Sequence, residues 1–283
     1  MKICWANTEN FADAEVVVFG VPDESKSHAL RKGSSEAPHK IREISNLRDV
    51  YKRGSEVSVG LPFEGISRRI YDLGNVARND AGRTVEKILS AAKVPIAIGG
   101  DHSVSTEIIR SVYKIRGPVS LVYFDAHPDF IASAGSYYGS VLADILPCID
   151  LKSSTQIGIR TPEQEEIDSI KRHSLHVVTP LDIMERGIVD VTCEILDRAR
   201  DNVYVSIDMD AIDPAFAPGV SVPVPLGLQS LEVLHVLKAL AKRRITGLDM
   251  MEVCPAYDIK DRTSHLASRM IGEVLSSLPN STA

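Results

Sequence analysis

The chain has 283 residues, of which 44% are hydrophobic and 25% are charged, values that are ordinary for a folded globular protein. Its formal net charge of −6 lacks the basic footprint that nucleic-acid binding requires. No run of about 18 apolar residues is present, so we expect no membrane span. The four scattered cysteines show no C-x-x-C spacing, and no apolar signal stretch opens the chain, which favours a cytoplasmic protein with reduced thiols.

Apolar, β-branched runs recur along the chain and predict parallel strands that are buried on both faces. They cover residues 15–21, 94–100, 119–125, 154–160, 175–179, 202–208 and 245–253. Helical patterns lie between or beside them, at residues 84–94, 106–115, 191–201, 230–243 and 264–278. This alternation predicts an α/β fold with a mainly parallel central sheet and helices on both of its faces. No long Pro/Gly/Ser-rich linker is present, so we expect a single domain over residues 1–283.

Acidic or imidazole side chains end four of the apolar runs. In an open α/β sheet, ligands bind outside the carboxyl ends of the strands. Asp125, His127 and Asp129 alternate along one segment, as do Asp208 and Asp210 along another. Residues two apart in extended backbone point to the same side. We therefore expect both sets to converge on one spot.

These side chains, together with His102, form a ligand set for two metal ions: His102, Asp125, His127, Asp129, Asp208 and Asp210. Carboxylates with two imidazoles suit Mn²⁺ or a similar ion better than a structural zinc. The four aspartates would balance the charge of two divalent ions, and without metal they would repel one another. Taken singly, such residues are more often helix caps, turn residues or hydrogen-bonded histidines, so the prediction depends on their joint occurrence. Asp101 and Asp213 we interpret as turn residues or as residues that orient the ligands.

Four motifs in this order resemble the signatures of the ureohydrolase family, which includes arginase and agmatinase. They read GGDHS, DAHPD, SIDMDAIDPAFAPG and DMMEVCP. FGVPDESKSHALRKGSSEAPHKIRE and YDLGNV resemble further family segments, although Asn75 replaces an acid. The resemblance covers nearly the whole chain and is closest to agmatinase-like members. It implies a three-layer α/β/α fold and a homo-oligomer, commonly a trimer or a hexamer.

The resemblance also implies a dimanganese centre in which two aspartates bridge the ions. One ion would take His102, Asp125, Asp129 and Asp208, and the other would take Asp125, His127, Asp208 and Asp210.

By the same resemblance, a metal-bridging hydroxide would attack the guanidinium carbon of a small cationic guanidino substrate and release urea and an amine. Asp129 would help to move the proton to the leaving nitrogen. Glu252 matches the family glutamate that pairs with the guanidinium group, and two carboxylate oxygens suit two N–H donors. An ordinary salt bridge is the alternative role for Glu252.

Tyr138 marks a departure from the family pattern. It stands in GSYYGSVLADIL (135–146), where family members carry a histidine that is assigned to proton shuttling. A phenol with an ordinary pKa of about 10 shuttles protons poorly at neutral pH. The chain could therefore be a slow enzyme, use another proton route, or act on a different amidine. His265 is the nearest alternative in the C-terminal motifs, but we favour a surface role for it at a predicted helix start.

A second departure bears on the substrate. Phe130 and Ile131 follow Asp129, where arginases carry an Ile-Asn pair that helps to hold the amino-acid end of arginine. An α-carboxylate without a polar partner is costly to desolvate. We therefore expect agmatine, which would give putrescine for polyamine synthesis, or another guanidino compound without that carboxylate. Three glutamates could meet a distal ammonium, although such a run is more commonly a solvated helix start: Glu163, Glu165 and Glu166.

Two other functions remain open from the sequence. Tyr138 motivates a catalytically weak, metal-binding relative with a regulatory or assembly role, although the intact ligand set argues against it. A zinc amidohydrolase acting on acylated polyamines is the other alternative, because deacetylases resemble this fold. The paired adjacent histidines of that family are absent here.

Overall fold

The computed structural model describes residues 1–48, 50–53, 56–57, 60–243 and 245–280. An eight-stranded sheet forms its centre, in the order β4–β1–β5–β10–β9–β6–β7–β8, and every pairing among these strands is parallel. The predicted α/β fold with a mainly parallel sheet is confirmed. The strands are β1 (Val16–Gly20), β4 (Ile70–Asn75), β5 (Val94–Ile98), β6 (Ser120–Phe124), β7 (Thr155–Ile157), β8 (His176–Val178), β9 (Val203–Asp208) and β10 (Gly247–Met251).

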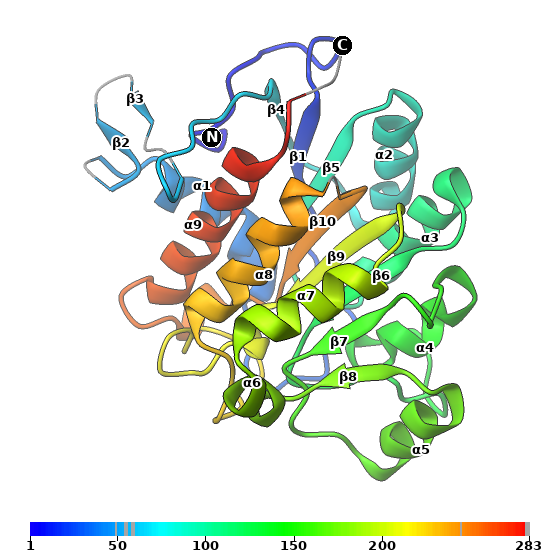
Figure 1. Cartoon of the computed structure of the whole chain (residues 1–283). Coiled ribbons are helices and arrows are strands. Elements are labelled where there is room, and N and C mark those ends of the chain that lie inside the picture. The colour runs from blue at the N-terminus through cyan, green and yellow to red at the C-terminus, as the bar shows by residue number, and fades with distance from the viewer. Residues whose placement is uncertain (49, 54–55, 58–59, 244, 281–283) are drawn as a thin grey trace.

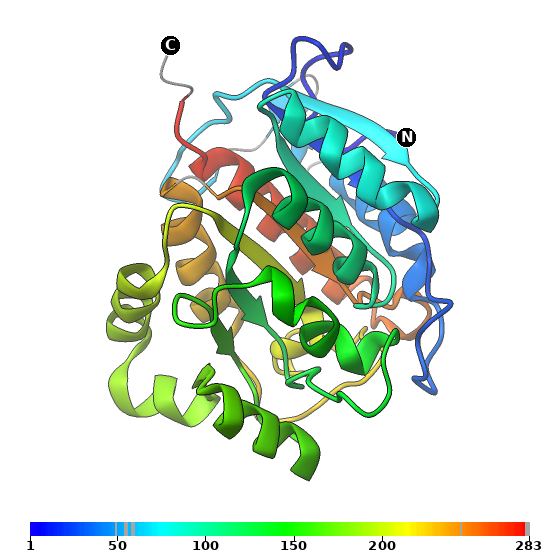
Figure 2. The same cartoon turned by 90° about the vertical axis from the view of Figure 1, so that its right-hand side faces the viewer.

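Helices cover both faces of this sheet, which makes three layers (Figures 1 and 2). One face carries α1 (Ala37–Ser45), α6 (Pro180–Arg186), α7 (Ile188–Arg198), α8 (Ser230–Lys242) and α9 (Arg262–Ser277). The other carries α2 (Arg78–Ser90), α3 (Val104–Arg116), α4 (Val141–Ile145) and α5 (Gln164–His173). Short 3₁₀ turns and one small antiparallel ribbon complete the described elements: η1 (Ser34–Glu36), η2 (Tyr138–Ser140), η3 (Leu146–Cys148), η4 (Met209–Ala211), η5 (Pro255–Tyr257), β2 (Lys52–Arg53) and β3 (Glu56–Val57).

Two apolar cores result from the alternation of side chains along each strand. In β1, Val16 and Val18 belong to the core under α1, α7, α8 and α9, while Val17 and Phe19 belong to the core under α2, α3 and α4. All five residues of β1 are buried. The continuous apolar runs of the sequence thus correspond to strands with helices on both sides.

All seven predicted strands and all five predicted helices are present, with shifted ends. The edge strand β4 was not among the predicted strands, because Asp72 and Gly74 interrupt its apolar pattern. Asp72 is instead buried in an ion pair with Arg42 of α1, at 2.8 Å between Nε and Oδ2. Helix α2 begins at Arg78, six residues before its predicted start. The prediction missed these residues because the first turns of the helix are polar.

Glycine lets the loop after β1 approach the end of β5. A Cβ atom at Gly100 would lie 2.0 Å from the carbonyl oxygen of Asp23, and that carbonyl accepts a hydrogen bond from the amide of Asp101 at 3.0 Å. The backbone of the two segments can therefore touch at this edge of the sheet.

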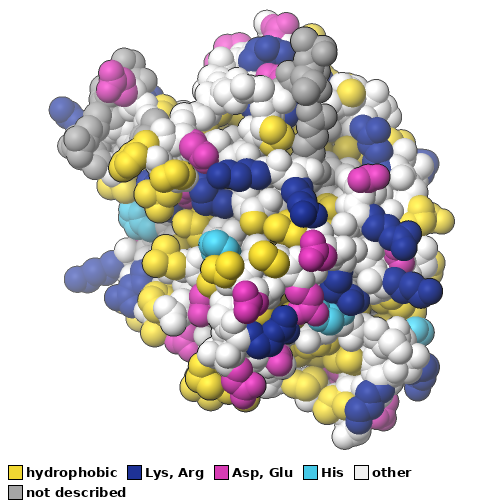
Figure 3. Space-filling view, viewed as in Figure 1, with side chains coloured by type: hydrophobic (Ala, Val, Ile, Leu, Met, Phe, Trp, Pro, Cys, Tyr) yellow, Lys and Arg dark blue, Asp and Glu magenta, His cyan; other side chains and the backbone are white. Residues whose placement is uncertain are grey.

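Figure 3 shows how the charged side chains are distributed over one face of the molecule. Acidic and basic side chains intermingle there over α1, α7, α8 and α9, and no single-sign field forms on that face. Among the helices that the structure describes, none combines the length and the apolar character needed to cross a bilayer.

Candidate metal centre and substrate site

Four strands that are neighbours in the sheet, β5, β10, β9 and β6, deliver the predicted site residues to one edge. His102 follows β5, and the DAHPD segment follows β6. Asp208 is the last residue of β9, Asp210 lies in η4, and Glu252 follows β10. This edge lies at the carboxyl ends of the strands, where the sequence predicted that a ligand binds.

A first cluster surrounds the Nδ1 atom of His102. Asp125 Oδ2 lies 3.0 Å from this nitrogen, Asp208 Oδ2 lies 3.2 Å from it, and Asp129 Oδ2 lies 3.4 Å from it. All four side chains are buried. One imidazole nitrogen thus meets three carboxylate oxygens in a space shielded from water.

A second cluster surrounds the Nδ1 atom of His127. Asp210 Oδ2 lies 3.1 Å from this nitrogen and Asp125 Oδ1 lies 3.3 Å from it. Asp125 therefore belongs to both clusters, with one oxygen toward each histidine. Among the described residues, two triads have ligand atoms close enough to share one ion: His102, Asp125 and Asp129 in the first, and Asp125, His127 and Asp210 in the second.

Backbone geometry fixes these side chains. The amide of His127 donates to Asp125 Oδ1 at 2.6 Å, and the amide of Asp210 donates to Asp208 Oδ1 at 2.7 Å. Asp129 and Glu252 adopt left-handed backbone conformations, with φ values of 50° and 62°. Such conformations cost free energy in residues other than glycine and gather at functional sites.

The electrostatics of the clusters favour a bound cation. Burial, and after it the charges of neighbouring aspartates, raise the pKa values of Asp129 and Asp208 well above their usual range. Burial also opposes the charge of Asp125, but hydrogen bonds from His102 and His127 hold its pKa below the usual range. Crowded carboxylates and two imidazole nitrogens are oxygen and nitrogen donors that suit divalent ions. The donor set therefore fits the expected pair of metal ions.

A buried polar network behind His102 was missed by the sequence analysis. His102 Nε2 lies 2.9 Å from the hydroxyl of Ser206, which donates to Asp249 Oδ1 at 2.6 Å. Tyr204 donates to the other oxygen of Asp249 at 2.9 Å. On the opposite side, Tyr123 donates to Asp129 Oδ2 at 2.6 Å. The available signal was polar residues within apolar strands, above all Asp249 in ITGLDMMEV.

Glu252 is only 2% exposed. Its Oε1 atom accepts a hydrogen bond from the backbone amide of His102 at 2.9 Å. Its Oε2 atom is buried and has no well-aligned hydrogen bond within the described residues, although the hydroxyl of Ser221 is close enough to lower the pKa of Glu252 as a donor would. Burial raises the pKa of this carboxyl group to about 7. A buried carboxylate oxygen beside the clusters, with no well-aligned protein donor, suits a ligand that brings its own N–H donor.

Tyr138 lies at the start of η2 and is half-buried. Burial is the main cause of its raised pKa, and the next contributions come from Glu252 and His127, the latter with opposite sign. Tyr138 is thus close enough to Glu252 and to the second cluster to feel their charge. Its backbone amide donates to the carbonyl of Lys26 at 3.4 Å, which ties it to the loop after β1.

Phe130 and Ile131 are 2% and 9% exposed, so both side chains are buried. The three glutamates form the start of α5, as the alternative interpretation held. Glu163 is the residue before the helix, and its amide donates to Glu166 at 2.8 Å. Glu166 also accepts from the amide of Phe130, and Glu165 accepts from the amides of Ala132 and Ser133. Their oxygens fix the loop after β6.

The remaining candidates have local roles. Asp101 accepts hydrogen bonds from Ser103 and from the amide of Lys26, and Asp213 accepts from the amides of Ala215 and Gly227, as expected of turn residues. His265 lies in the first turn of α9 and is half-buried, with its ring centroid 6.0 Å from that of Tyr51. His265 thus lies at a helix start, as predicted, and its surface role stays a prediction.

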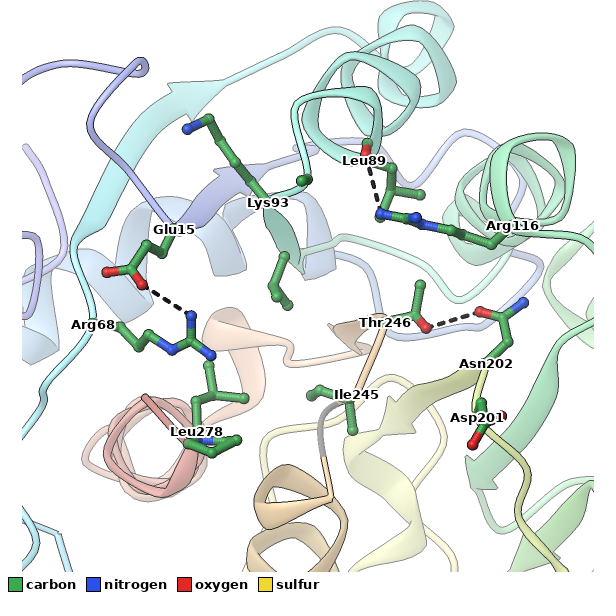
Figure 4. Close-up of a pocket in the computed structure, with 13 residues that line it drawn as sticks. Glu15, Arg68, Leu89, Lys93, Arg116, Asp201, Asn202, Ile245, Thr246 and Leu278 are labelled. Atoms are coloured by element: carbon green, nitrogen blue, oxygen red, sulfur yellow. Dashed lines mark hydrogen bonds and ion pairs between the residues drawn. The ribbon is translucent and has the colours of Figure 1, made fainter. Parts of the chain in front are cut away.

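A separate cavity of about 480 Å³ lies at the opposite edge of the sheet, beside the amino ends of β5, β9 and β10 (Figure 4). Its polar groups bond to protein atoms: Arg68 to Glu15 at 3.0 Å, Thr246 to Asn202 at 2.8 Å, and Arg116 to the carbonyl of Leu89 at 3.2 Å. The ligand clusters lie at the carboxyl edge, so this cavity is distinct from the candidate site.

The fold and this site define an α/β protein whose carboxylate and imidazole clusters meet at the carboxyl edge of a parallel sheet. The family model described as "Arginase family" matches residues 14–276, and the chain belongs to that family. Members of this family are hydrolases of guanidino compounds. The predicted relationship to ureohydrolases is confirmed.

Comparisons with individual proteins support the same family relationship. Proclavaminate amidinohydrolase of Streptomyces clavuligerus is 33% identical over 279 residues, covering 92% of this chain and 87% of the relative. Agmatinase of Citrobacter koseri is 33% identical over 275 residues, covering 93% of this chain and 87% of the relative. The crystal structure of agmatine ureohydrolase of Thermoplasma volcanium superposes with a TM-score of 0.85 at 30% identity, covering 98% of this chain and 93% of that one.

Proposed function

We propose that this protein is an agmatinase-like ureohydrolase that uses two Mn²⁺ ions to hydrolyse agmatine to urea and putrescine. The observation that carries the proposal is the position of Asp125, whose two oxygens lie 3.0 Å and 3.3 Å from the nitrogens of two different histidines. One carboxylate between two clusters is the arrangement that a bridged pair of ions requires.

The first ion would be held by His102, Asp125, Asp129 and Asp208, and the second by Asp125, His127, Asp208 and Asp210. Bound there, the ions would supply Lewis acidity and lower the pKa of water toward about 7. In the reaction, water adds to the guanidinium carbon and the bond from that carbon to the alkyl nitrogen breaks.

Glu252 would bind and orient the guanidinium group. Its Oε2 atom, which has no well-aligned hydrogen bond, offers an acceptor to an N–H donor, and its Oε1 atom is already fixed by the amide of His102. A charge-assisted contact of this kind holds the carbon in a fixed position for attack. Asp129, with the hydroxyl of Tyr123 on its Oδ2 atom, would carry a proton to the leaving nitrogen.

The substrate assignment rests on what the site lacks. Phe130 and Ile131 are buried apolar residues at the positions where a polar pair would hold an α-carboxylate. An unpaired carboxylate there would be costly to desolvate, so a guanidine with an amine tail is favoured over arginine. The relatives include a proclavaminate amidinohydrolase at similar identity, which makes a different guanidino compound the second candidate.

We extend the proposal to the whole protein by the same family relationship. We infer a single domain over residues 1–283, a homo-oligomer with trimer or hexamer as the expected sizes, and a cytoplasmic location. Four cysteines without disulfides support the last point.

The test is urea release by the Mn²⁺-loaded protein from agmatine, arginine, shorter guanidino acids and proclavaminate, with bound metal counted by elemental analysis. Urea from agmatine, with two Mn²⁺ per chain, supports the proposal. Urea from another guanidine only would keep the reaction and overturn the substrate. Two bound ions without urea from any compound would favour the regulatory metal-binding relative, and zinc-dependent amine release without urea would favour the amidohydrolase.

A further inference from the structure

Three aromatic rings from two different loops contact one another beside the candidate site. The rings of His28 and Tyr137 stack at 5.1 Å between centroids with 20° between planes. Tyr138 meets both rings edge-on, at 6.1 Å from His28 and 5.7 Å from Tyr137. We call these residues the aromatic triad. His28 was not singled out by the sequence analysis.

The triad is held at the junction of the loops that follow β1 and β6. The amide of Tyr138 donates to the carbonyl of Lys26, and the amide of Lys26 donates to Asp101 Oδ2 at 3.1 Å. On the other side, the amide of Leu142 donates to the carbonyl of Asp129 at 2.9 Å. Backbone bonds thus connect the triad to the turn that bears His102 and to the segment that bears Asp129.

The triad is open to a ligand. Tyr137 and Tyr138 are half-buried and His28 is exposed. Among the described residues, the hydroxyl of Tyr138 and the imidazole nitrogens of His28 make no hydrogen bond to the protein. The rings can therefore offer faces and polar atoms to a molecule that enters the site.

The charges around the triad are acidic. After burial, the groups that act most strongly on Tyr137 are Asp129, Glu166 and Glu163, and Glu252 acts on Tyr138. The nearest cation on the same loop, Lys26, is engaged at 4.0 Å with Glu107 of α3. The faces of aromatic rings attract cations, including when the ligand aspartates are neutralised by metal, and an ammonium group over a ring gains up to about 2 kcal/mol when water is excluded.

We propose that the aromatic triad binds the cationic amine tail of the substrate while Glu252 holds its guanidinium end. This inference rests on the proposed function and deepens it, because it names the residues that select an amine tail. It also explains why Glu163, Glu165 and Glu166 are not needed for that role, since Glu165 and Glu166 are occupied by the loop after β6.

The test compares agmatine with n-pentylguanidine, in which a methyl group replaces the amine at the same length. KM and kcat are measured for the wild type and for His28→Ala, Tyr138→Ala and Tyr138→Phe. Tyr113→Ala, at an exposed tyrosine near the end of α3, serves as the matched control. Thermal unfolding of each metal-loaded variant confirms that it is folded.

We expect each alanine variant to raise KM for agmatine by about 2- to 30-fold with little change in kcat. KM for n-pentylguanidine should change much less, and Tyr138→Phe should behave like the wild type because it keeps the ring. Equal losses on both substrates would overturn the inference, since they would indicate general packing. A fall in kcat with unchanged KM would also overturn it, because it would assign the triad to proton transfer.

Equilibrium binding separates this inference from the proposed function. If the wild type releases no urea, calorimetric titration of the Mn²⁺-loaded protein with agmatine and n-pentylguanidine still measures tail selectivity. A preference for agmatine that the alanine variants lose would support the triad even though the proposed reaction had failed. Equal affinity of the wild type for both compounds would overturn it.

Discussion

His102 and Ser206 are joined by a contact of 2.9 Å between Nε2 and the hydroxyl oxygen, and this contact sets the tautomer of the imidazole. The hydroxyl of Ser206 donates its proton to Asp249, so it can only accept a hydrogen bond from Nε2. Nε2 therefore carries a proton, so in the neutral imidazole that a metal ion requires, Nδ1 is the nitrogen whose lone pair faces the three carboxylates. A carboxylate behind the imidazole also strengthens that lone pair as a ligand.

Removal of this support should weaken metal binding. We expect Ser206→Ala to lower Mn²⁺ affinity by about 10- to 100-fold at the His102 cluster, because His102 loses its buried partner. Titration with Mn²⁺, in which the free ion is followed by its electron paramagnetic resonance signal, measures the affinities of both metal sites. Tyr204→Phe is the control, since it removes a different hydrogen bond to Asp249. Two unchanged affinities in Ser206→Ala would contradict the role assigned to Ser206.

Asp125→Asn should abolish metal-dependent turnover, because it removes the charge shared by both clusters. We expect the purified variant to retain fewer than two ions by elemental analysis. Asp80→Asn is the matched control, because Asp80 is exposed and pairs with Arg83 within the same helix. Near-normal turnover of Asp125→Asn would refute the assignment of a bridged pair of ions.

Glu252→Gln should reduce kcat/KM for agmatine by about 10- to 100-fold, because a neutral amide replaces the charged acceptor of the guanidinium group. The metal content should stay the same, since Glu252 belongs to neither ligand cluster. Glu86→Gln is the control variant, because it removes an ion pair with Lys114 on the surface. Loss of metal together with activity would instead make Glu252 a structural support of His102.

Glu273 gives a pH-dependent contribution to stability that is independent of metal. Burial alone would raise its pKa, but hydrogen bonds from Lys238, from the amide of Leu61 and from Arg269 hold the pKa below its ordinary value of 4.5. A depressed carboxyl pKa stabilises the fold above pH 4.5, and this contribution is lost as the pH falls through the pKa of the folded state.

Glu273→Gln should therefore lower the free energy of unfolding by about 1–3 kcal/mol at pH 7. The difference from the wild type should shrink as the pH falls below about 4.5. Denaturant unfolding at pH 7, 5 and 3.5 measures it. A difference that stays constant over this range would show that the charge of Glu273 contributes nothing.

Metal should stabilise the fold, because the clusters exist only when the sheet is formed. At Mn²⁺ concentrations about 100-fold above the dissociation constant, linkage adds about 2.7 kcal/mol for each site. We expect the midpoint of thermal unfolding to rise by roughly 5–10 °C for one site, and more for two. In Asp125→Asn the same addition should raise it much less. An equal rise in that variant would place the stabilising ion elsewhere.

The sequence was most informative where chemistry and periodicity coincide. Continuous apolar runs predicted seven of the strands, and the predicted convergence of Asp125, His127 and Asp129 is found, although the backbone there is not extended, since Asp129 is left-handed. These features depend on nearest neighbours in the chain. β4 was missed because its acid pairs with Arg42, thirty residues away, which no local pattern reveals.

The site residues that the sequence did not predict were missed for the same reason, because their contacts join segments that are distant in the chain. Ser206 and Asp249 lie on β9 and β10, and their link to His102 follows from the order of strands in the sheet, which the sequence does not contain. His28 carries no motif, and its contact with Tyr138 depends on how two loops fold over the sheet edge. Contacts between distant segments are set by tertiary packing.

Strand β10 has a consequence for the biosynthesis of the protein. It is the last strand of the sheet in the chain, yet it lies between β5 and β9 and joins two blocks of strands, β4–β1–β5 and β9–β6–β7–β8. His102 belongs to the first block, and the aspartates of both clusters belong to the second. We therefore expect a nascent chain that has not released residues 247–251 from the ribosome to keep His102 apart from His127 and the four aspartates. Completion of the His102 cluster is thus expected to be a late step in the folding of this protein.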